Sequence, residues 1–359
     1  MLLVFFVCLL VVFSLFALKK KGKNFSPVFP ADKASVELLT QEQTAFFSDP
    51  LRFKDHEMVL TPRKIDLSRP APVVFRWKSA QPSCGILQIS KRKDFKKIFQ
   101  QHTVRGYSAK VYNLEPGTRY YWRLLGDKIS SGIFTFTTSV RLPRMIHLPD
   151  VSNVRDCGGW KTLGGKTYRL GMLYRGAHLV SPRPGNLPQI NAKGIEIFLK
   201  QLGICTELDL RKGGKPGKFV KNIRYVNVPA SAYATWGREG IFSPEQKAVY
   251  RKIFTLLADE TAYPIYFHCA GGGDRTGTLA YILGSVLGMK EEDLLDDYEY
   301  SNLSVSGERS RFTFVWTEFM KKLDTFPGQT RHDRVVNYLY SCGVTPEQLN
   351  KIRRILLAD

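Results

Sequence analysis

The chain has few of the residues that build metal sites and disulfide frameworks. Its 359 residues include six cysteines and six histidines. The cysteines lie at positions 8, 84, 157, 205, 269 and 342, with no C-x-x-C pair and no regular spacing. This pattern argues against a zinc site and against a disulfide-bonded scaffold. It favours a protein in which one cysteine is reactive and the others are inert.

Acidic residues are also scarce. Lys and Arg number 53 against 32 Asp and Glu, which gives a net charge of +21 and a pI of about 9.7. Such a field favours phosphorylated substrates or an anionic membrane surface as partners. No nucleic-acid partner is expected, because the chain has neither a helix-turn-helix pattern nor an aromatic-and-glycine signature. The 43% hydrophobic and 24% charged residues are typical of a folded protein, and the length allows two domains.

One long apolar run occupies residues 1–18 and is followed by Lys19-Lys20-Lys21-Gly22-Lys23. Such a run is at the lower limit for crossing a bilayer and long for the core of a signal peptide. We therefore expect a transmembrane anchor or signal segment at 1–18 and a basic, polar tether at 19–57. Under the positive-inside rule the lysines would leave the bulk of the chain in the cytoplasm. A start codon assigned too late would reverse that orientation.

Short strand-like segments recur between residues 58 and 139, separated by Pro and Gly turns. This spacing predicts an all-β sandwich. The segment resembles a fibronectin type III domain through Trp77 and the L-x-P-G-T-x-Y corner at 114–120. The resemblance implies a binding or spacing module of unknown ligand, and in bacteria such modules usually belong to exported proteins. An exported or membrane-anchored protein on the periplasmic or extracellular side is therefore favoured. The expected strands are Val73–Trp77, Gly85–Ser90, Ala109–Tyr112, Tyr120–Leu124 and Ile133–Thr137.

Strand-like and helical segments alternate from residue 140 to residue 359. Helical spacing in Asn191–Leu202 is followed by buried strands at Ile204–Arg211 and Ile223–Pro229. This order predicts an α/β domain with a central, largely parallel sheet. Gly164–Thr167 looks like the end of a nucleotide P-loop, but Trp160 stands where that motif needs a glycine. A simple turn is predicted there.

The strongest functional signal is the segment His268–Gly277, with the sequence HCAGGGDRTG. It lies between a strand-like segment, Tyr263–Phe267, and a helix predicted from Thr278. Backbone N–H groups at a helix N-terminus attract phosphate, and glycines at 271–273 let the backbone curl around it. A cysteine in such a place can have a pKa of about 3.5–7.5 instead of about 8.5, and so reacts as a thiolate.

This chemistry predicts a role for each residue of the loop. Cys269 attacks phosphorus and forms a phosphocysteine that water hydrolyses. Arg275 holds two phosphate oxygens, and Thr276 donates a hydrogen bond to the sulfur. No metal or cofactor is expected, because Arg275 and the amides supply the positive field. The loop residues expected to bind substrate are Ala270, Gly271, Gly272, Gly273 and Gly277.

The same segment carries the C-x5-R-[S/T] signature of the protein tyrosine phosphatase superfamily. From about residue 143 onward the chain resembles the bacterial tyrosine-phosphatase family with dual-specificity and phosphoinositide activity. The family's N-x-R-D-x-G-G, L-Y-R and D-L-R elements appear at Asn153–Gly159, Leu173–Arg175 and Asp209–Arg211. The resemblance implies a protein tyrosine phosphatase, with a phosphoinositide or inositol-polyphosphate phosphatase as one alternative. A non-catalytic phosphate-binding or adhesion protein is the other.

The general acid has several candidates. The segment 231–240, where the superfamily usually carries its Asp, contains only Glu239. Asp274 is our first choice, because the resembled family and the myotubularin-type lipid phosphatases carry an Asp at this loop position. Asp209 is second, as an acid or an orienting group, unless it only forms a salt bridge to Arg211 or caps a helix.

Other residues are expected to support the loop. Arg175 and His268 are candidates for such positions, and Arg155 and Asp156 are expected to pair with each other. Phosphoinositide-active members often carry Lys immediately before the loop Asp, where this chain has Gly273. That substitution lowers the case for polyphosphoinositides, unless a later arginine, Arg309 or Arg311, supplies the missing charge.

Overall fold

The computed structural model describes residues 25–48, 65–126, 130–180, 190–217, 223–233, 239–305 and 309–359. The apolar run predicted to be an anchor or signal lies outside these residues. Among the helices that the structure describes, none is long and apolar enough to cross a membrane. The chain divides into two compact units. The β unit comprises Met1–Val36, Val74–Lys110 and Arg119–Thr137, and the α/β unit comprises Glu37–Val73, Val111–Thr118 and Thr138–Asp359.

The β unit is built from two sheets, in the strand orders β1-β3-β6 and β2-β8-β7-β4-β5. Alternate side chains of β3 and β7 are buried, and the Phe75 ring packs edge-on against Trp122 at a centroid distance of 5.3 Å. This alternation is typical of strands with one face toward a core. The strands are β1 (Ser26–Phe29), β2 (Ala34–Val36), β3 (Val73–Lys78), β4 (Ser83–Ser90), β5 (Gln100–Gly106), β6 (Ser108–Val111), β7 (Arg119–Gly126) and β8 (Phe134–Thr138).

Part of the segment predicted as a tether, residues 19–57, has regular structure. β1 pairs with β3 and β2 lies beside β8 in the sheets of the β unit, and α1 (Gln41–Ser48) follows. The five predicted strands each lie within one of the observed strands to within one or two residues. β5 was not predicted, because Val104 is its only large apolar residue and gives no alternating pattern.

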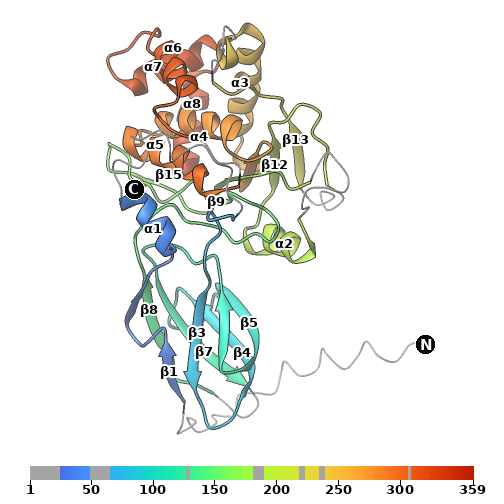
Figure 1. Ribbon diagram of the computed structural model, residues 1–359, viewed down its shortest axis with the longest axis vertical. Coiled ribbons are helices and arrows are strands. Elements are labelled where there is room, and N and C mark those ends of the chain that lie inside the picture. Colours follow the sequence, from blue (N-terminus) through green and yellow to red (C-terminus); the bar gives the residue numbers. More distant parts are fainter. Residues whose placement is uncertain are drawn as a thin grey trace, which may run out of the picture. The chain divides into compact units, whose positions relative to one another are not determined.

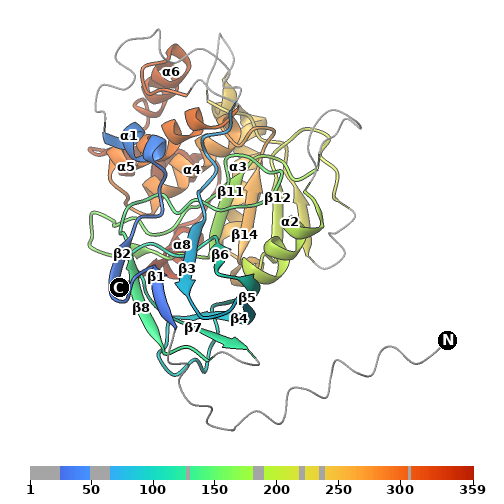
Figure 2. The same ribbon diagram turned by 60° about the horizontal axis from the view of Figure 1, so that its bottom comes forward.

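The α/β unit is organised around a five-stranded sheet in the order β13-β12-β14-β11-β9. β12, β13, β14 and β11 are parallel, and β9 is antiparallel to β11. Figure 2 shows β11, β14 and β12 side by side. The predicted α/β fold with a largely parallel sheet is confirmed. The strands are β9 (Arg155–Asp156), β11 (Leu173–Gly176), β12 (Thr206–Asp209), β13 (Arg224–Asn227) and β14 (Ile265–His268).

Helices cover both faces of this sheet (Figure 1). Leu173 and Phe267 belong to the large core under the C-terminal helices, whereas Tyr174 and Tyr266 pack with the region of α2. The helices are α2 (Ala192–Glu196) with η2 (Ile197–Gln201), α3 (Pro244–Leu257), α4 (Asp274–Val286), α5 (Glu291–Glu299), α6 (Phe314–Leu323), α7 (Arg331–Ser341) and α8 (Pro346–Leu356). Shorter elements are β10 (Thr167–Tyr168), η4 (Gly240–Phe242), η5 (Glu260–Ala262), η6 (Tyr300–Leu303) and β15 (Leu357–Ala358).

The α/β unit includes two segments that precede the predicted boundary at residue 139. From α1, the ring of Phe47 stacks on buried Tyr300 at a centroid distance of 5.4 Å. The backbone N–H of Asn153 donates to Ser68 Oγ at 3.0 Å. The boundary between the two compact units therefore does not fall at a single point between residues 139 and 140, because residues 37–73 and 111–118 belong to the α/β unit.

Local hydrogen bonds define the turn around Gly165 and the starts of two helices, α8 and α3. Gly165 has a φ of +82° in a turn closed by a bridge between Lys161 and Thr167, so the P-loop-like segment is the predicted turn. α8 begins with a complete capping box, in which Thr345 and Gln348 exchange side-chain-to-backbone hydrogen bonds. The corresponding box at the start of α3 is not closed, because the Gln246 side chain accepts a hydrogen bond from the Ser231 N–H instead.

Candidate active site

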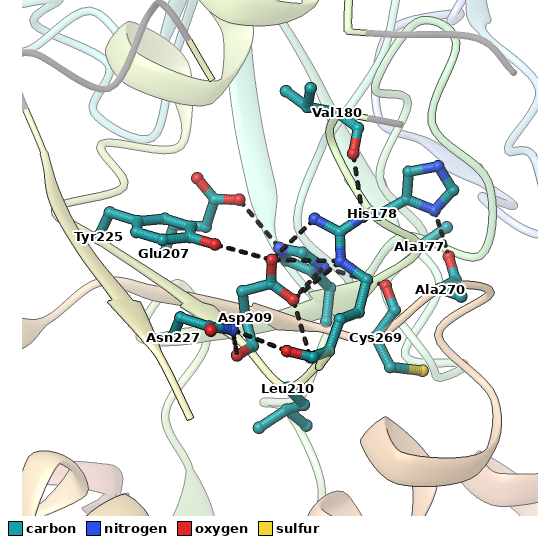
Figure 3. A network of polar contacts seen from close by, with 12 residues as sticks. Ala177, His178, Val180, Glu207, Asp209, Leu210, Tyr225, Asn227, Cys269 and Ala270 are labelled. Carbon is teal, nitrogen blue, oxygen red and sulfur yellow. Dashed lines mark hydrogen bonds and ion pairs between the residues drawn. The ribbon is translucent and has the colours of Figure 1, made fainter. Parts of the chain in front are cut away.

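The predicted phosphate loop joins the central strand of the sheet to a helix. β14 ends at His268, the loop runs through residues 269–273, and α4 begins at Asp274. The helix thus starts four residues before the predicted Thr278, which places Arg275 in its first turn. Cys269 is 2% exposed, and its sulfur lies inside the curve of the loop that runs on to α4 (Figure 3). The strand–loop–helix arrangement expected for this segment is confirmed.

Three successive carbonyl groups of the loop accept hydrogen bonds from side chains outside it. The donors belong to segments at and beside β11 and β9, far away in the sequence. Each bond therefore ties the loop to the neighbouring edge of the sheet. The bonds are His178 Nδ1 with Ala270 O at 2.7 Å, Asn153 Nδ2 with Gly271 O at 3.1 Å, and an Arg175 terminal nitrogen with Gly272 O at 2.9 Å.

The amide groups of the same loop are differently placed. Within the described part of the chain, no protein group accepts a hydrogen bond from the backbone N–H groups of residues 270–275. A trans peptide unit is planar, with its N–H pointing opposite to its C=O. Because the three carbonyls bond outward, the N–H groups of Gly271, Gly272 and Gly273 point to the opposite, inner side. Such a ring of amides at a helix N-terminus is suited to binding an anion.

Gly272 is required by the path of the loop. Its φ is +74°, and a Cβ at this position would lie 2.5 Å from the backbone carbon and oxygen of Gly176. No side chain fits there without moving the loop or the end of β11. Gly273 is different, because the atoms nearest to a Cβ there would belong to the Arg309 guanidinium, with Nε at 2.7 Å.

A buried carboxylate, Asp297 on α5, joins the donors that hold the loop. Its Oδ1 accepts from Arg155 Nε at 2.6 Å, and its Oδ2 pairs with Arg175. Arg155 in turn bonds to Asn153, and both arginines are completely buried. Burial alone would raise the pKa of Asp297, but the two arginines outweigh it and lower that pKa. Asp297 was missed in the sequence, because no local motif links α5 to the loop.

The predicted pair between Arg155 and Asp156 is wrong. Asp156 instead accepts from Arg144 at 2.9 Å and from the Gly158 N–H. The two residues are neighbours on β9, and successive side chains of a strand point to opposite faces. Arg155 and Asp156 therefore bond to different parts of the α/β unit, Arg155 to Asp297 and Asp156 to Arg144.

Asp209 forms a salt bridge to Arg211, which is the alternative that the sequence left open to a role as the acid. Arg211 donates to it through Nε and Nη2, the latter at 2.7 Å. Tyr225 donates to it through its hydroxyl at 2.9 Å (Figure 3). Burial raises the pKa of Asp209, but the bonds from Arg211 and the nearby His268 outweigh it and lower that pKa. Asp209 is also completely buried, and a carboxylate that is closed off from solvent and has a lowered pKa is unsuited to supplying a proton to a leaving group. Asp209 therefore orients Arg211, whose other terminal nitrogen donates to Val180 O.

His268 supports the backbone directly before the loop. It is fully buried, with Nε2 2.9 Å from Glu207 Oε1 and Nδ1 3.1 Å from Cys269 O. Both ring nitrogens thus face acceptor oxygens, which fixes the orientation of the ring. Glu207 on β12 was not anticipated from the sequence, because its partner is 61 residues away.

Asp274, the preferred acid, lies at the start of α4 with its side chain 46% exposed. Its Oδ2 accepts from Arg309 at 2.7 Å, and its Oδ1 accepts from the Tyr233 hydroxyl at 3.1 Å. Tyr233 has a φ of +46°, an uncommon conformation for a large side chain. Glu239 is exposed at the start of η4, and residues 234–238 of the predicted acid segment lie outside the described residues.

The structure separates the two arginines proposed to replace the missing lysine. Arg309 lies beside Gly273 and bonds to Asp274, whereas Arg311 bonds to Glu299 and Asp296. Only Arg309 of this pair contacts the loop.

Arg275 and Thr276 form few side-chain hydrogen bonds with the described residues. Arg275 is half-buried and reaches Leu210 O only at 3.5 Å, a long contact for a hydrogen bond. Thr276 is buried, and its Oγ1 has no hydrogen-bond partner among the described residues. The predicted hydrogen bond from Thr276 to the Cys269 sulfur is therefore not formed here.

Two of the other cysteines, Cys157 and Cys342, fit the expectation of inert thiols. Burial raises the pKa of Cys157 well above its usual value and that of Cys342 to about 11. Neither thiol is ionised at neutral pH, and thiolates are the reactive form.

Comparison with known proteins agrees with this geometry. The chain is 28% identical over 175 residues to a tyrosine-protein phosphatase of Cupriavidus necator, covering 42% of this chain and 61% of that protein. It is 25% identical over 177 residues to the triple specificity protein phosphatase PtpB of Mycobacterium tuberculosis, covering 41% and 63%. The chain thus spans about three fifths of the length of these curated relatives.

Two solved structures of the Siw14 catalytic core are also similar. One is the PP-IP phosphatase SIW14 from S. cerevisiae with citrate, at 18% identity and a TM-score of 0.28 over 37% of this chain and 74% of that one. The other has 15% identity and a TM-score of 0.30 over 43% and 80%. Residues 146–358, more than half of the chain, match the model of the tyrosine phosphatase family. The chain belongs to the tyrosine phosphatase family.

Proposed function

We propose that the protein is a cysteine-dependent phosphomonoesterase that acts chiefly on phosphotyrosine in proteins. The observation that carries the proposal is the loop after β14. Its carbonyls at 270, 271 and 272 are bonded outward, and its amides face the side on which a phosphate would bind. A thiol in the curve of such a loop is placed to attack the phosphorus of a bound phosphate ester.

The reaction proceeds in two displacements. Cys269 Sγ attacks phosphorus, the bond from phosphorus to the ester oxygen breaks, and Asp274 gives its proton to the leaving oxygen. A water then attacks the phosphocysteine, its proton goes to Asp274, and phosphate leaves as the thiolate is restored. Arg275 and the amides of the loop balance the charge on the phosphoryl oxygens throughout. Tyr233 and Arg309 position the Asp274 carboxyl group through the contacts already described.

A phosphoinositide or inositol polyphosphate is the second candidate substrate. Arg309 supports it, because its guanidinium lies beside Gly273 at the loop. A guanidinium there can bind a second phosphate as well as orient Asp274. Phosphotyrosine stays the first candidate, because Arg309 already bonds to Asp274 and a second phosphate would compete for it.

The test is a substrate panel on the full chain, with Cys269→Ser as the control. Turnover of phosphotyrosine peptide, phosphoserine peptide, phosphoinositides and inositol hexakisphosphate is compared by phosphate release. We expect phosphotyrosine to be hydrolysed fastest and Cys269→Ser to release no phosphate while still binding tungstate. Turnover by Cys269→Ser would contradict the mechanism, and faster hydrolysis of a polyphosphate would favour the second substrate class. Tungstate binding without turnover by the wild type would indicate a phosphate-binding module.

The β unit is proposed to be a fibronectin type III-like spacer in an exported or membrane-anchored protein. The apolar run at 1–18 supports the location, and Trp77 on β3 and Tyr120 on β7, two of the residues that carry the resemblance, support the module. Protease accessibility of the full chain in intact cells tests the location: digestion from outside is expected, and protection until lysis would contradict it.

A further inference from the structure

The positive charge of the chain is concentrated in the β unit. By sequence, that unit holds seventeen Lys and Arg against three Asp and Glu, a net of +14 out of +21 for the whole chain. It comprises only 92 of the 359 residues. The proposed phosphatase site lies in the other unit, so substrate binding does not account for this charge.

Among the described residues of the β unit, the turn at residues 91–97, between β4 and β5, carries the densest part of the charge. Its sequence is KRKDFKK, and all residues except Phe95 are exposed. Phe95 is 6% exposed and has a φ of +53°, so the turn is anchored by one buried aromatic ring. The Arg123 guanidinium lies 4.2 Å from the centre of that ring. The lysines are thus presented on a structured turn.

Hydrogen bonds fix the backbone of the 91–97 turn. Ser90 Oγ donates to Lys97 O at 2.7 Å and accepts from the Arg92 N–H at 3.0 Å. Asp94 pairs with Arg92 and accepts from the Lys96 N–H. The ammonium groups of Lys93, Lys96 and Lys97 take no part in these bonds. Because the backbone of the turn is already fixed, only the lysine side chains lose conformational entropy when the turn binds an anionic surface.

We propose that the 91–97 turn of the β unit binds the surface of an anionic phospholipid bilayer. A bilayer is favoured over a soluble polyanion because the same unit begins with the apolar run at 1–18 and four lysines at 19–23. Each basic residue near an anionic leaflet strengthens binding by about fivefold. The turn adds five cations to the four that follow the apolar run.

The test measures how the full chain partitions onto vesicles of phosphatidylcholine alone and onto vesicles with about a third phosphatidylglycerol. Any contribution of the apolar run is shared by both vesicle types, so the ratio of the two partition coefficients isolates the charge-dependent part. The turn variant is Lys93→Glu/Lys96→Glu/Lys97→Glu. The matched control carries the same charge change on exposed lysines of the α/β unit, Lys200→Glu/Lys252→Glu/Lys351→Glu.

We expect the turn variant to lower the ratio at least about tenfold, and the control less than about threefold. High salt should reduce the ratio of the wild type toward that of the turn variant. An unchanged ratio, or an equal fall in the control, would overturn the proposal. So would a turn variant that loses binding to heparin but keeps its vesicle ratio, because a soluble polyanion would then be the partner. Hydrolysis of p-nitrophenyl phosphate should be equal in all three proteins, which separates this test from that of the proposed phosphatase.

Discussion

At the scale of the residue, Asp297 holds the cysteine loop although it does not touch it. Both of its oxygens are bonded to buried arginines, one of which donates to Gly272 O while the other bonds to Asn153. Replacing the carboxylate by an amide removes the negative charge that balances the two guanidinium groups. The two guanidinium groups then repel each other and shift. The loop carbonyls of Gly271 and Gly272 therefore lose the fixed positions of their donors, Asn153 and Arg175.

Asp297→Asn should lower kcat/KM about 10- to 100-fold, because small displacements of a preorganised site are costly. The inhibition constant of tungstate should rise in parallel, since the same amides bind it. Asp296→Asn is the matched control, because Asp296 is the neighbouring acid of α5 and pairs with Arg311. Folding is checked by thermal unfolding, and Asp297→Glu should recover part of the activity. A normal tungstate constant in folded Asp297→Asn would show that Asp297 does not position the loop.

The assignment of Asp274 as the acid predicts a dependence on the leaving group. Asp274→Asn should slow phenyl phosphate, a poor leaving group, by about 100-fold or more, and p-nitrophenyl phosphate much less. Tyr233→Phe removes one donor to the same carboxyl group and should shift both rates in the same sense but by a smaller factor. The measurement is kcat for a series of aryl phosphates of graded acidity. Equal losses across the series would move the acid elsewhere, with Glu239 as the next substitution to make.

At the level of secondary-structure elements, the cysteine loop passes so close to the end of β11 that residue 272 must be a glycine. Gly272→Ala would place a Cβ 2.5 Å from the Gly176 backbone at a φ of +74°. We expect kcat/KM to fall about 100-fold or more, together with weaker tungstate binding. Gly203→Ala is the control, because Gly203 has a φ of +66° with open space around it. It should cost about 1 kcal/mol of stability and leave activity unchanged. Comparable losses of activity in both would attribute the effect to backbone strain alone.

Local signals predicted the elements that carry them. The alternation of strands and helices gave the parallel sheet, and the HCAGGGDRTG segment lies between β14 and α4 as expected. The contacts to Asp297, Glu207 and Tyr233 could not be predicted, because each joins segments more than 40 residues apart. β1 and β2 were missed for a related reason, since short strands in a polar segment are stabilised by their partners in the sheet.

At the scale of the whole molecule, the α/β unit depends on segments that come before residue 140. Phe47 stacks on Tyr300, which is fully buried, and Asn153 donates to Ser68. Arg144 is buried and donates to the backbone oxygen of Asn113 at 2.7 Å. A fragment of residues 140–359 would therefore expose an aromatic ring and leave buried polar groups without partners.

We expect this fragment to unfold at a temperature at least about 10 °C below that of the full chain. The lost contacts lower the free energy of unfolding by several kcal/mol, and each kcal/mol shifts the unfolding midpoint by about 2–4 °C. Its activity toward p-nitrophenyl phosphate should fall with the folded fraction, since Asn153 also donates to the loop at Gly271. Phe47→Ala in the full chain isolates one of the lost contacts and should lower the midpoint by only a few degrees. Thermal unfolding followed by circular dichroism measures all three proteins. A fragment as stable and as active as the full chain would show that the catalytic unit begins near residue 140, as the sequence alone suggested.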